Sequence, residues 1–249
     1  MEPLFQALGA GALVGLAFPL GALLSRLNPF GHAGFAVAMA GGAGLLLAVA
    51  LVDLLPGARE GGGLGVALGG FLGAALLYSA LNRWIHWRGG ENRKRCGGCV
   101  APPAEAERPG SGTAIVVGSV MDALPEAVLL GAVAAMGGVS PGLVTALVLG
   151  NAAQAMSATS GLRHSGRSPR FVWGLWSAVG VCVAGLSAAA CFSAQFLPPV
   201  AQSALMAVAA GGLIAMIAEA MLPEASERAT PFVGLMAALG AALFLLVHA

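Results

Sequence analysis

The sequence predicts an all-α membrane protein with eight transmembrane helices. Of its 249 residues, 58% are hydrophobic and only 9% are charged. A soluble domain uses about 25% charged residues to cover its surface. The low charge therefore indicates that most of this protein's surface faces lipid. The spacing of the apolar segments gives the number of crossings.

Eight segments are long enough to cross, since a membrane helix needs about 20 apolar residues. They cover residues 3–24, 34–55, 61–81, 112–136, 141–162, 171–190, 201–222 and 231–247. Pro198 and Pro199 separate the sixth segment from the seventh, because adjacent prolines end a helix. We therefore expect one transmembrane domain over residues 1–249. Residues 82–111, rich in Arg, Pro, Gly and Glu, form a flexible cytoplasmic loop within it.

The basic residues predict the orientation. If the N-terminus lies outside, eleven of the 12 Lys and Arg residues fall in inner loops and only Arg59 lies outside. The eleven are Arg26, Arg83, Arg88, Arg93, Lys94, Arg95, Arg108, Arg163, Arg167, Arg170 and Arg228. The positive-inside rule then requires an even number of spans and places both termini outside. We expect an integral protein of the cell membrane, with the lipid bilayer and no nucleic acid as a partner.

A weak repeat relates the second span to the seventh. Aligning Pro56 with Pro223 superposes residues 43–60 on residues 210–227 and places Gly44 on Gly211. If spans one to three repeat as spans six to eight, the copies are inverted and flank helices four and five. Inverted repeats are typical of transporters with sites near the bilayer midplane. Chance similarity between two Ala- and Leu-rich helices is the alternative.

Ionisable residues within the spans are few, and each needs a reason because a charge in the membrane is costly. Asp122 and Glu126 lie four apart, on one face of the fourth helix. Pro125 between them donates no backbone hydrogen bond, which leaves the carbonyl of Met121 free to face a cavity. The alternative is a pair of protonated acids that only hydrogen-bond between helices.

Two amides on the fifth helix, Asn151 and Gln154, also share a face. Amides in membranes commonly tie helices together. Opposite the acidic pair, however, they would complete a cation site of oxygen ligands. Asp53 and Glu219 lie near the ends of the second and seventh spans, where each either reaches the headgroups or lines a path. Glu224 is expected beyond the membrane.

The cysteines and the known catalytic motifs predict no catalytic centre. Cys96 and Cys99 form a single Cys-x-x-Cys in the cytoplasmic loop, which is either a soft-metal or redox pair or simply a solvated loop. Cys182 and Cys191 are expected to pack within helix six. The sequence contains no Walker loop, no Gly-x-Ser-x-Gly elbow and no Gly-x-Gly-Asp motif. We therefore expect neither an enzyme nor a bound cofactor.

The layout and motifs resemble the ZIP (Zrt/Irt-like) metal transporters over nearly the whole chain. The family's fourth helix carries His-Asn-x-Pro-Glu-Gly, which corresponds here to Asp-Ala-Leu-Pro-Glu-Ala at 122–127. Its two further ligands on helix five resemble Asn151 and Gln154. The Leu-Leu-Pro at 54–56 and the Glu-x-x-x-Pro-Glu at 219–224 are similar to family patterns in helices two and seven.

The chain also departs from the family pattern. Asp122 replaces the family histidine, the carboxylates of helix five have become amides, and helix six has Val181 and Cys182 where many members have an acid. The remaining carboxylate and amide ligands suit Mn²⁺, Mg²⁺ or Ca²⁺ and accept Fe²⁺, whereas zinc favours nitrogen and sulfur.

The resemblance implies a transporter that carries a divalent cation of the Zn, Fe or Mn class toward the cytoplasm by alternating access. Asp122 and Glu126 would supply charge, and Asn151 and Gln154 neutral oxygens. A proton-coupled carrier of another small solute is one alternative. A metal sensor or scaffold without transport is another. Faces of small residues permit a homodimer.

Overall fold

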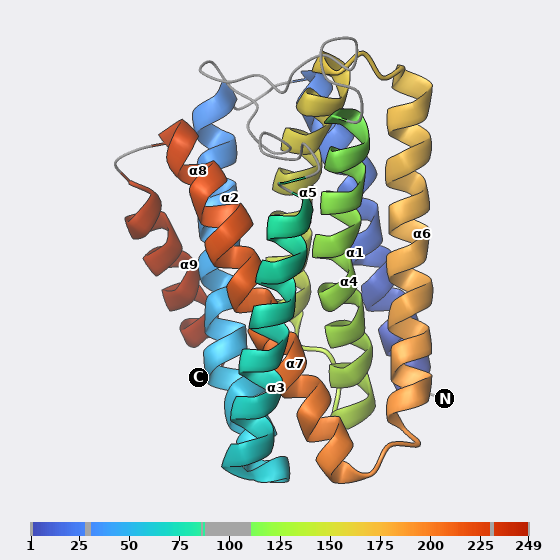
Figure 1. Cartoon of the computed structure of the whole chain (residues 1–249), viewed down its shortest axis with the longest axis vertical. Helices are drawn as coiled ribbons and strands as arrows, with labels where there is room; N and C mark the ends of the chain where they lie inside the picture. Colours follow the sequence, from blue (N-terminus) through green and yellow to red (C-terminus); the bar gives the residue numbers. More distant parts are fainter. Residues whose placement is uncertain (1, 28–30, 86, 88–110, 230–231, 249) are drawn as a thin grey trace.

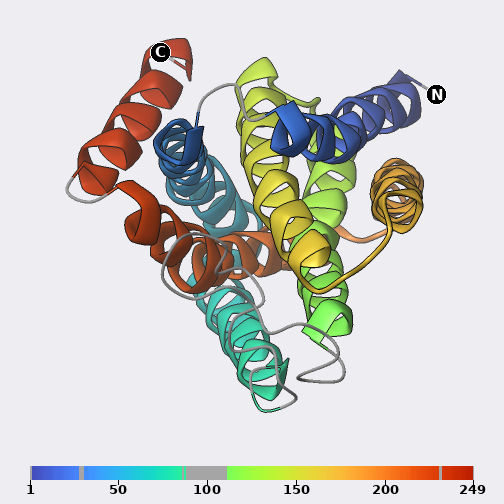
Figure 2. The same cartoon turned by 90° about the horizontal axis from the view of Figure 1, so that it is seen from above.

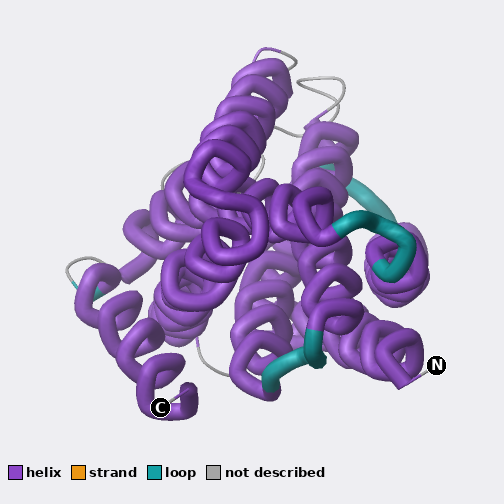
Figure 3. Tube along the Cα trace, turned by 90° about the horizontal axis from the view of Figure 1, so that it is seen from below, coloured by secondary structure: helices purple, strands orange, loops and turns teal. Residues whose placement is uncertain are grey.

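The computed structural model describes residues 2–27, 31–85, 87, 111–229 and 232–248, and this part is helical without strands (Figure 3). The first half comprises α1 (Glu2–Leu27), α2 (Gly31–Ala48), the π-helix η1 (Val49–Leu54), α3 (Leu55–Ile85) and α4 (Ser111–Met136). The second half comprises α5 (Pro141–His164), α6 (Pro169–Ala194), α7 (Pro199–Met216), the π-helix η3 (Ile217–Met221), α8 (Leu222–Ala229) and α9 (Val233–His248).

Five helical segments among the described residues are long and apolar enough to cross a membrane. They are Glu2–Leu27, Ala36–Ile85, Ile115–Met136, Pro169–Ala194 and Pro199–Ser226. Large apolar side chains such as Leu76, Val181 and Leu246 are exposed on the outside. These features are consistent with an integral membrane protein. Helix α5 is more polar and α9 has only 16 residues, so the count of eight spans stays a prediction.

The segment Ala36–Ile85 is 50 residues long, and it folds back on itself. Helix α2 descends in Figure 1 and α3 ascends beside it. The reversal centres on Gly63, whose φ of 78° favours glycine because a Cβ strains this conformation. The reversal therefore lies close to the break predicted between residues 55 and 61.

Two π-helical turns occur at matching places. Each of η1 and η3 is followed at once by a leucine and a proline, Leu55-Pro56 in one case and Leu222-Pro223 in the other. A proline has no N–H and its ring clashes with the carbonyl four residues earlier. A widened turn accommodates the ring, because it moves that carbonyl into a different hydrogen-bond pattern.

One group of helices is built around the crossing of α1 and α6. A Cβ on Gly15 would lie 2.4 Å from the carbonyl oxygen of Gly180, and a Cβ on Gly180 would lie 2.5 Å from that of Gly15. The two backbones therefore touch, which only glycine permits. Helix α1 also packs against α5, and α6 packs against α4.

Four other helices form two close pairs. Helix α2 packs on α9 and α7 packs on α3, as the view from above shows (Figure 2). Gly44 of α2 lies against the backbone of Ala237, and Gly211 of α7 lies against that of Phe71. The two glycines that the sequence repeat superposes thus make equivalent contacts with their neighbouring helices.

The predicted cytoplasmic loop is shorter at its start than expected. Helix α3 continues to Ile85, so residues 82–85 are helical, and α4 begins at Ser111. Residues 88–110, with Cys96 and Cys99, lie outside the described residues. In α6, Cys191 is buried as expected for a packing residue, whereas Cys182 is exposed.

Candidate polar site along helix five

Helix α5 carries a line of polar side chains through the interior. Asn151, Gln154 and Ser157 follow one another at intervals of three, so they share one face. All three are buried, with at most 8% of the residue exposed. The helix is fixed at its start by Ser140, whose side chain accepts a hydrogen bond from the backbone N–H of Leu143 at 3.2 Å. Three buried polar side chains on one helix face need hydrogen-bond partners, which neighbouring helices can supply.

Glu126 of α4 is the partner of Asn151. The amide Nδ2 of Asn151 donates a hydrogen bond to Oε2 of Glu126, and both residues are only 1% exposed. The structure therefore brings together two of the four residues predicted as metal ligands, one from each of the two predicted helices. A buried carboxylate against a buried amide is a strongly polar contact in an apolar interior.

Asp122, one turn before Glu126, is held by helix α3 instead. The hydroxyl of Tyr78 donates a hydrogen bond to Oδ1 of Asp122 at 2.5 Å, and both side chains are buried. Sequence reasoning missed Tyr78. The signal that could have found it is that this residue is the chain's single tyrosine, placed within a predicted span. A buried tyrosine needs a hydrogen-bond partner for its hydroxyl.

Glu224 is a second buried glutamate, and the sequence analysis did not predict its burial. It is only 4% exposed, and the hydroxyl of Ser157 donates a hydrogen bond to its Oε1. The missed signal is a repeated tetrapeptide, because Leu-Pro-Glu-Ala occurs at 124–127 and again at 222–225. In both copies the glutamate reaches the polar face of α5.

Two amide atoms on this face have no hydrogen-bond partner within the described part of the chain. They are Oδ1 of Asn151 and Nε2 of Gln154, and both are buried. Buried polar atoms are nearly always paired, with protein, water or a ligand. The acceptor on Asn151 lies beside the Glu126 carboxylate, so a cation at this point would receive oxygens from both residues. Gln154 lies one turn further along α5.

The two residues predicted to line a path lie on the π-helical turns. Glu219, on η3, is exposed and accepts hydrogen bonds from the Ser79 hydroxyl and, at 2.6 Å, from Nδ2 of Asn82. Both donors belong to α3. Asp53, on η1, is half-buried. Glu219 therefore joins η3 to α3, and its hydrogen bonds run to that helix and not to the amides of α5.

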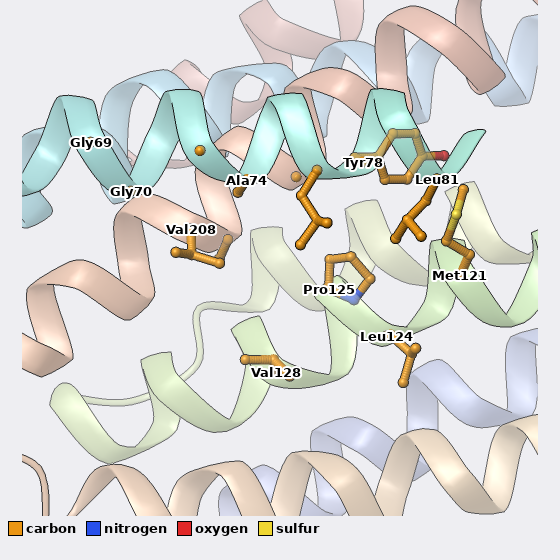
Figure 4. Close-up of a pocket in the computed structure, with 14 residues that line it drawn as sticks. Gly69, Gly70, Ala74, Tyr78, Leu81, Met121, Leu124, Pro125, Val128 and Val208 are labelled. Atoms are coloured by element: carbon orange, nitrogen blue, oxygen red, sulfur yellow. The ribbon is translucent and has the colours of Figure 1, made fainter. Parts of the chain in front are cut away.

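A cavity of about 440 Å³ lies beside the proline of α4, between α3, α4 and α7 (Figure 4). Met121 and Pro125 line it, as does Tyr78, but its other lining residues are apolar, and neither Asp122 nor Glu126 is among them. The two acids lie away from the cavity, one bonded to α3 and the other to α5.

The ligand chemistry of the site is carboxylate and amide. Within the described ranges, no three His, Cys, Asp or Glu side chains come together as a metal-binding group. A cation here would take its ligands from Glu126 and the Asn151 oxygen, with water completing the shell. Such a weak, oxygen-only shell suits Mn²⁺, Mg²⁺ or Ca²⁺ better than Zn²⁺.

No protein-family model matches the chain, and no curated protein matches it. The function is therefore inferred from the chain's own residues, above all the buried acids and amides where α4 and α8 meet α5.

Proposed function

We propose that the chain is a ZIP-like transporter that moves a divalent metal cation across the membrane toward the cytoplasm, through a site between α4 and α5. The observation that carries this proposal is the buried contact of Glu126 with the Asn151 amide, whose oxygen Oδ1 has no hydrogen-bond partner among the described residues. Intramembrane carboxylates usually mark an ion path. Here the carboxylate and a neutral oxygen come from two different helices.

The arrangement of helices supports an alternating-access carrier. Under the predicted inverted repeat, α1, α2 and α3 correspond to α6, α7 and α9. The pair α2 and α9 then corresponds to α7 and α3, and the contact of α1 with α5 corresponds to that of α6 with α4. The two π-helical turns fall at corresponding places as well. A site between two such halves can open to either side in turn.

The proposal includes a topology for the whole chain. Eight spans, with both termini outside the cell membrane, put eleven of the 12 Lys and Arg residues on the cytoplasmic side. Asp122 and Glu126 together carry two negative charges, which neutralise one divalent cation. Gln154, Ser157 and Glu224 then continue a polar line along α5 by which the ion leaves the site.

The test is uptake of Mn²⁺, Fe²⁺, Zn²⁺ and Co²⁺ into proteoliposomes. Wild-type protein should give saturable flux of at least one of these ions. Asp122→Asn/Glu126→Gln, which keeps the size of both side chains, should lose that flux. Glu60→Gln removes an exposed carboxylate from α3 and serves as the control that retains it. Absence of flux from a folded, correctly oriented wild type would refute the proposal.

A second candidate is a proton-coupled carrier of another small solute. It is favoured by the absence of any three-residue His, Cys, Asp or Glu group in the described parts of the chain. In this case Asp122 or Glu126 carries the proton. The discriminating measurement is proton uptake into the same vesicles under a pH gradient. Solute-dependent proton flux that none of the four metals changes supports the second candidate. Absence of both metal flux and proton flux indicates a non-transporting sensor or scaffold.

A further inference from the structure

A small cavity lies at the end of the bundle where α1 ends and α6 begins, the upper end in Figure 1. Its volume is about 120 Å³, and two arginines line it, Arg26 from α1 and Arg163 from α5. Thr159 and Trp173 line it as well, and its remaining walls are apolar. None of the described residues that line the cavity is acidic. Two arginines, both exposed, thus line one space together.

Two positive charges that share a cavity repel each other, unless an anion lies between them. Arginine is suited to this role because its planar fork of N–H donors matches the oxygens of a phosphate or carboxylate. The first turn of α6 borders the same cavity at Pro169. A helix N-terminus carries partial positive charge, which adds to the attraction for an anion.

Thr159 supplies a donor from the protein interior. The residue is only 3% exposed, and its Oγ1 accepts a hydrogen bond from the indole Nε1 of Trp176 at 2.8 Å. This contact uses the oxygen as an acceptor and leaves the hydroxyl hydrogen to donate. The donors at this cavity therefore comprise two guanidinium groups and one buried hydroxyl, a set that matches the several acceptor oxygens of one phosphate group.

The size of the cavity and its surroundings indicate where the phosphate comes from. Pockets for whole organic ligands usually measure about 300 to 1,000 Å³, so this cavity admits a single group and not a complete molecule. Around it, Leu23 and Leu27 of α1 and Trp173 of α6 are exposed. Tryptophan and arginine together are typical of the membrane interface, with the ring at the headgroup level. An acyl chain would meet an apolar surface here.

We propose that this cavity binds the phosphate group of an anionic membrane lipid, with Arg26 and Arg163 as its ligands and the acyl chains against the exposed apolar side chains of α1 and α6. The lipid would join α1, α5 and α6 at the end that the charge distribution assigns to the cytoplasm, where anionic lipids gather. The site is separate from the acids of α4 and does not depend on what the protein transports.

The test is lipid retention by the intact protein in mild detergent, measured by native mass spectrometry with phosphatidylglycerol, phosphatidylcholine or inorganic phosphate added. Phosphatidylglycerol should be retained in preference to phosphatidylcholine. Arg26→Gln/Arg163→Gln should weaken its affinity about tenfold or more, as expected for lost hydrogen bonds to a charged group. The affinity of Arg26→Lys/Arg163→Lys for phosphatidylglycerol should lie between those of the wild type and the Gln double variant. Lysine keeps the positive charge but lacks the planar fork of N–H donors.

Arg170→Gln is the matched control, because Arg170 is an exposed arginine in the first turn of α6 that does not line the cavity. It should retain the lipid as the wild type does. Equal retention by wild type and the Gln double variant would overturn the proposal, as would equal retention of the two lipids. If inorganic phosphate competes as strongly as phosphatidylglycerol at equal concentration, the site holds a free anion and the lipid assignment is wrong. Circular dichroism of each variant confirms that it is folded.

Discussion

Ser157 and Glu224 share a buried hydrogen bond, although 67 positions separate them in the sequence. Asn151 makes the equivalent contact with Glu126 on the same face of α5. Each glutamate is the third residue of a Leu-Pro-Glu-Ala tetrapeptide. Helix α5 is therefore held between two buried carboxylates, one from α4 and one from α8, with Gln154 between the two contacts.

Replacing each of these glutamates in turn tests whether both belong to one path. Glu126→Gln and Glu224→Gln keep the side-chain size and remove one negative charge. If a divalent cation passes along α5, each change should lower its uptake about tenfold or more, because each removes a charged ligand. The measurement is initial uptake rate in proteoliposomes. A rate unaffected by Glu224→Gln would limit the site to α4 and the first part of the α5 face.

Asn151→Asp converts the amide beside Glu126 into a second carboxylate. Two carboxylates in contact disfavour each other's charged form unless a cation or a proton lies between them. We expect a lower melting temperature in the absence of metal and a larger rise on adding Mn²⁺ than the wild type shows. Thermal unfolding with and without Mn²⁺ measures both. Equal metal-induced shifts in variant and wild type would indicate that no cation binds beside residue 151.

Tyr78→Phe removes the donor that α3 provides to Asp122 and keeps the aromatic ring. Loss of a hydrogen bond to a buried carboxylate should lower the free energy of unfolding by about 1–3 kcal/mol. Ser79→Ala is the neighbouring comparison, since the Ser79 hydroxyl bonds to the exposed Glu219, which keeps a second donor in Asn82. Its effect on the midpoint of thermal unfolding should be smaller. A larger loss of stability in Ser79→Ala than in Tyr78→Phe would contradict a stabilising hydrogen bond from Tyr78 to Asp122.

Gly180→Ala tests the contact between α1 and α6. The new Cβ would lie 2.5 Å from the carbonyl oxygen of Gly15, so the backbones must separate. Overpacking of this kind costs about 1–3 kcal/mol. Gly185→Ala, on the same helix, places its Cβ in open space and should leave the thermal unfolding midpoint nearly unchanged. Similar midpoints for the two variants would contradict the close crossing.

Two glycines of α3 test whether α4 moves against α3 during transport. A Cβ on Gly73 meets no atom within 4 Å, whereas one on Gly70 would lie 2.8 Å from the Cβ of Ala207. The side chain of Gly73→Leu therefore starts in open space at the cavity beside Pro125. It should leave stability within about 1 kcal/mol of the wild type, whereas Gly70→Leu should destabilise the protein.

If the cavity closes when the carrier changes state, Gly73→Leu should slow uptake while metal affinity stays unchanged. Initial rates over a range of metal concentrations separate the two effects. Wild-type kinetics in a folded Gly73→Leu variant would show that the cavity keeps its volume throughout the cycle.

The helical segments could be predicted from the sequence because lipid imposes a length and a composition on each crossing. Gly63 lies near the predicted break for the same reason, since a chain that must reverse direction needs a residue that tolerates positive φ. These two features depend on local sequence alone. Placing Asn151 and Gln154 opposite Asp122 and Glu126, in contrast, rested on the resemblance to the ZIP transporters, in which the metal path runs between helices four and five.

Other parts of the site depend on contacts between distant segments. Glu224 precedes Ser226, Glu227 and Arg228, a polar stretch typical of a segment that lies at the lipid headgroups. In the fold it is buried, and it accepts a hydrogen bond from Ser157 on another helix. The cavity beside Pro125 is apolar because Asp122 and Glu126 are drawn to α3 and α5, and a proline in the sequence does not indicate in which direction its neighbours turn.

The crossing of α1 and α6 has the form of a contact across a two-fold axis. Gly15 and Gly180 each lie against the other's carbonyl oxygen, as one residue meets its own copy at the centre of a symmetric dimer interface. The single chain thus contains, folded into itself, the kind of interface that identical subunits share. A substitution on either side of this crossing is therefore transmitted to both halves of the bundle at once.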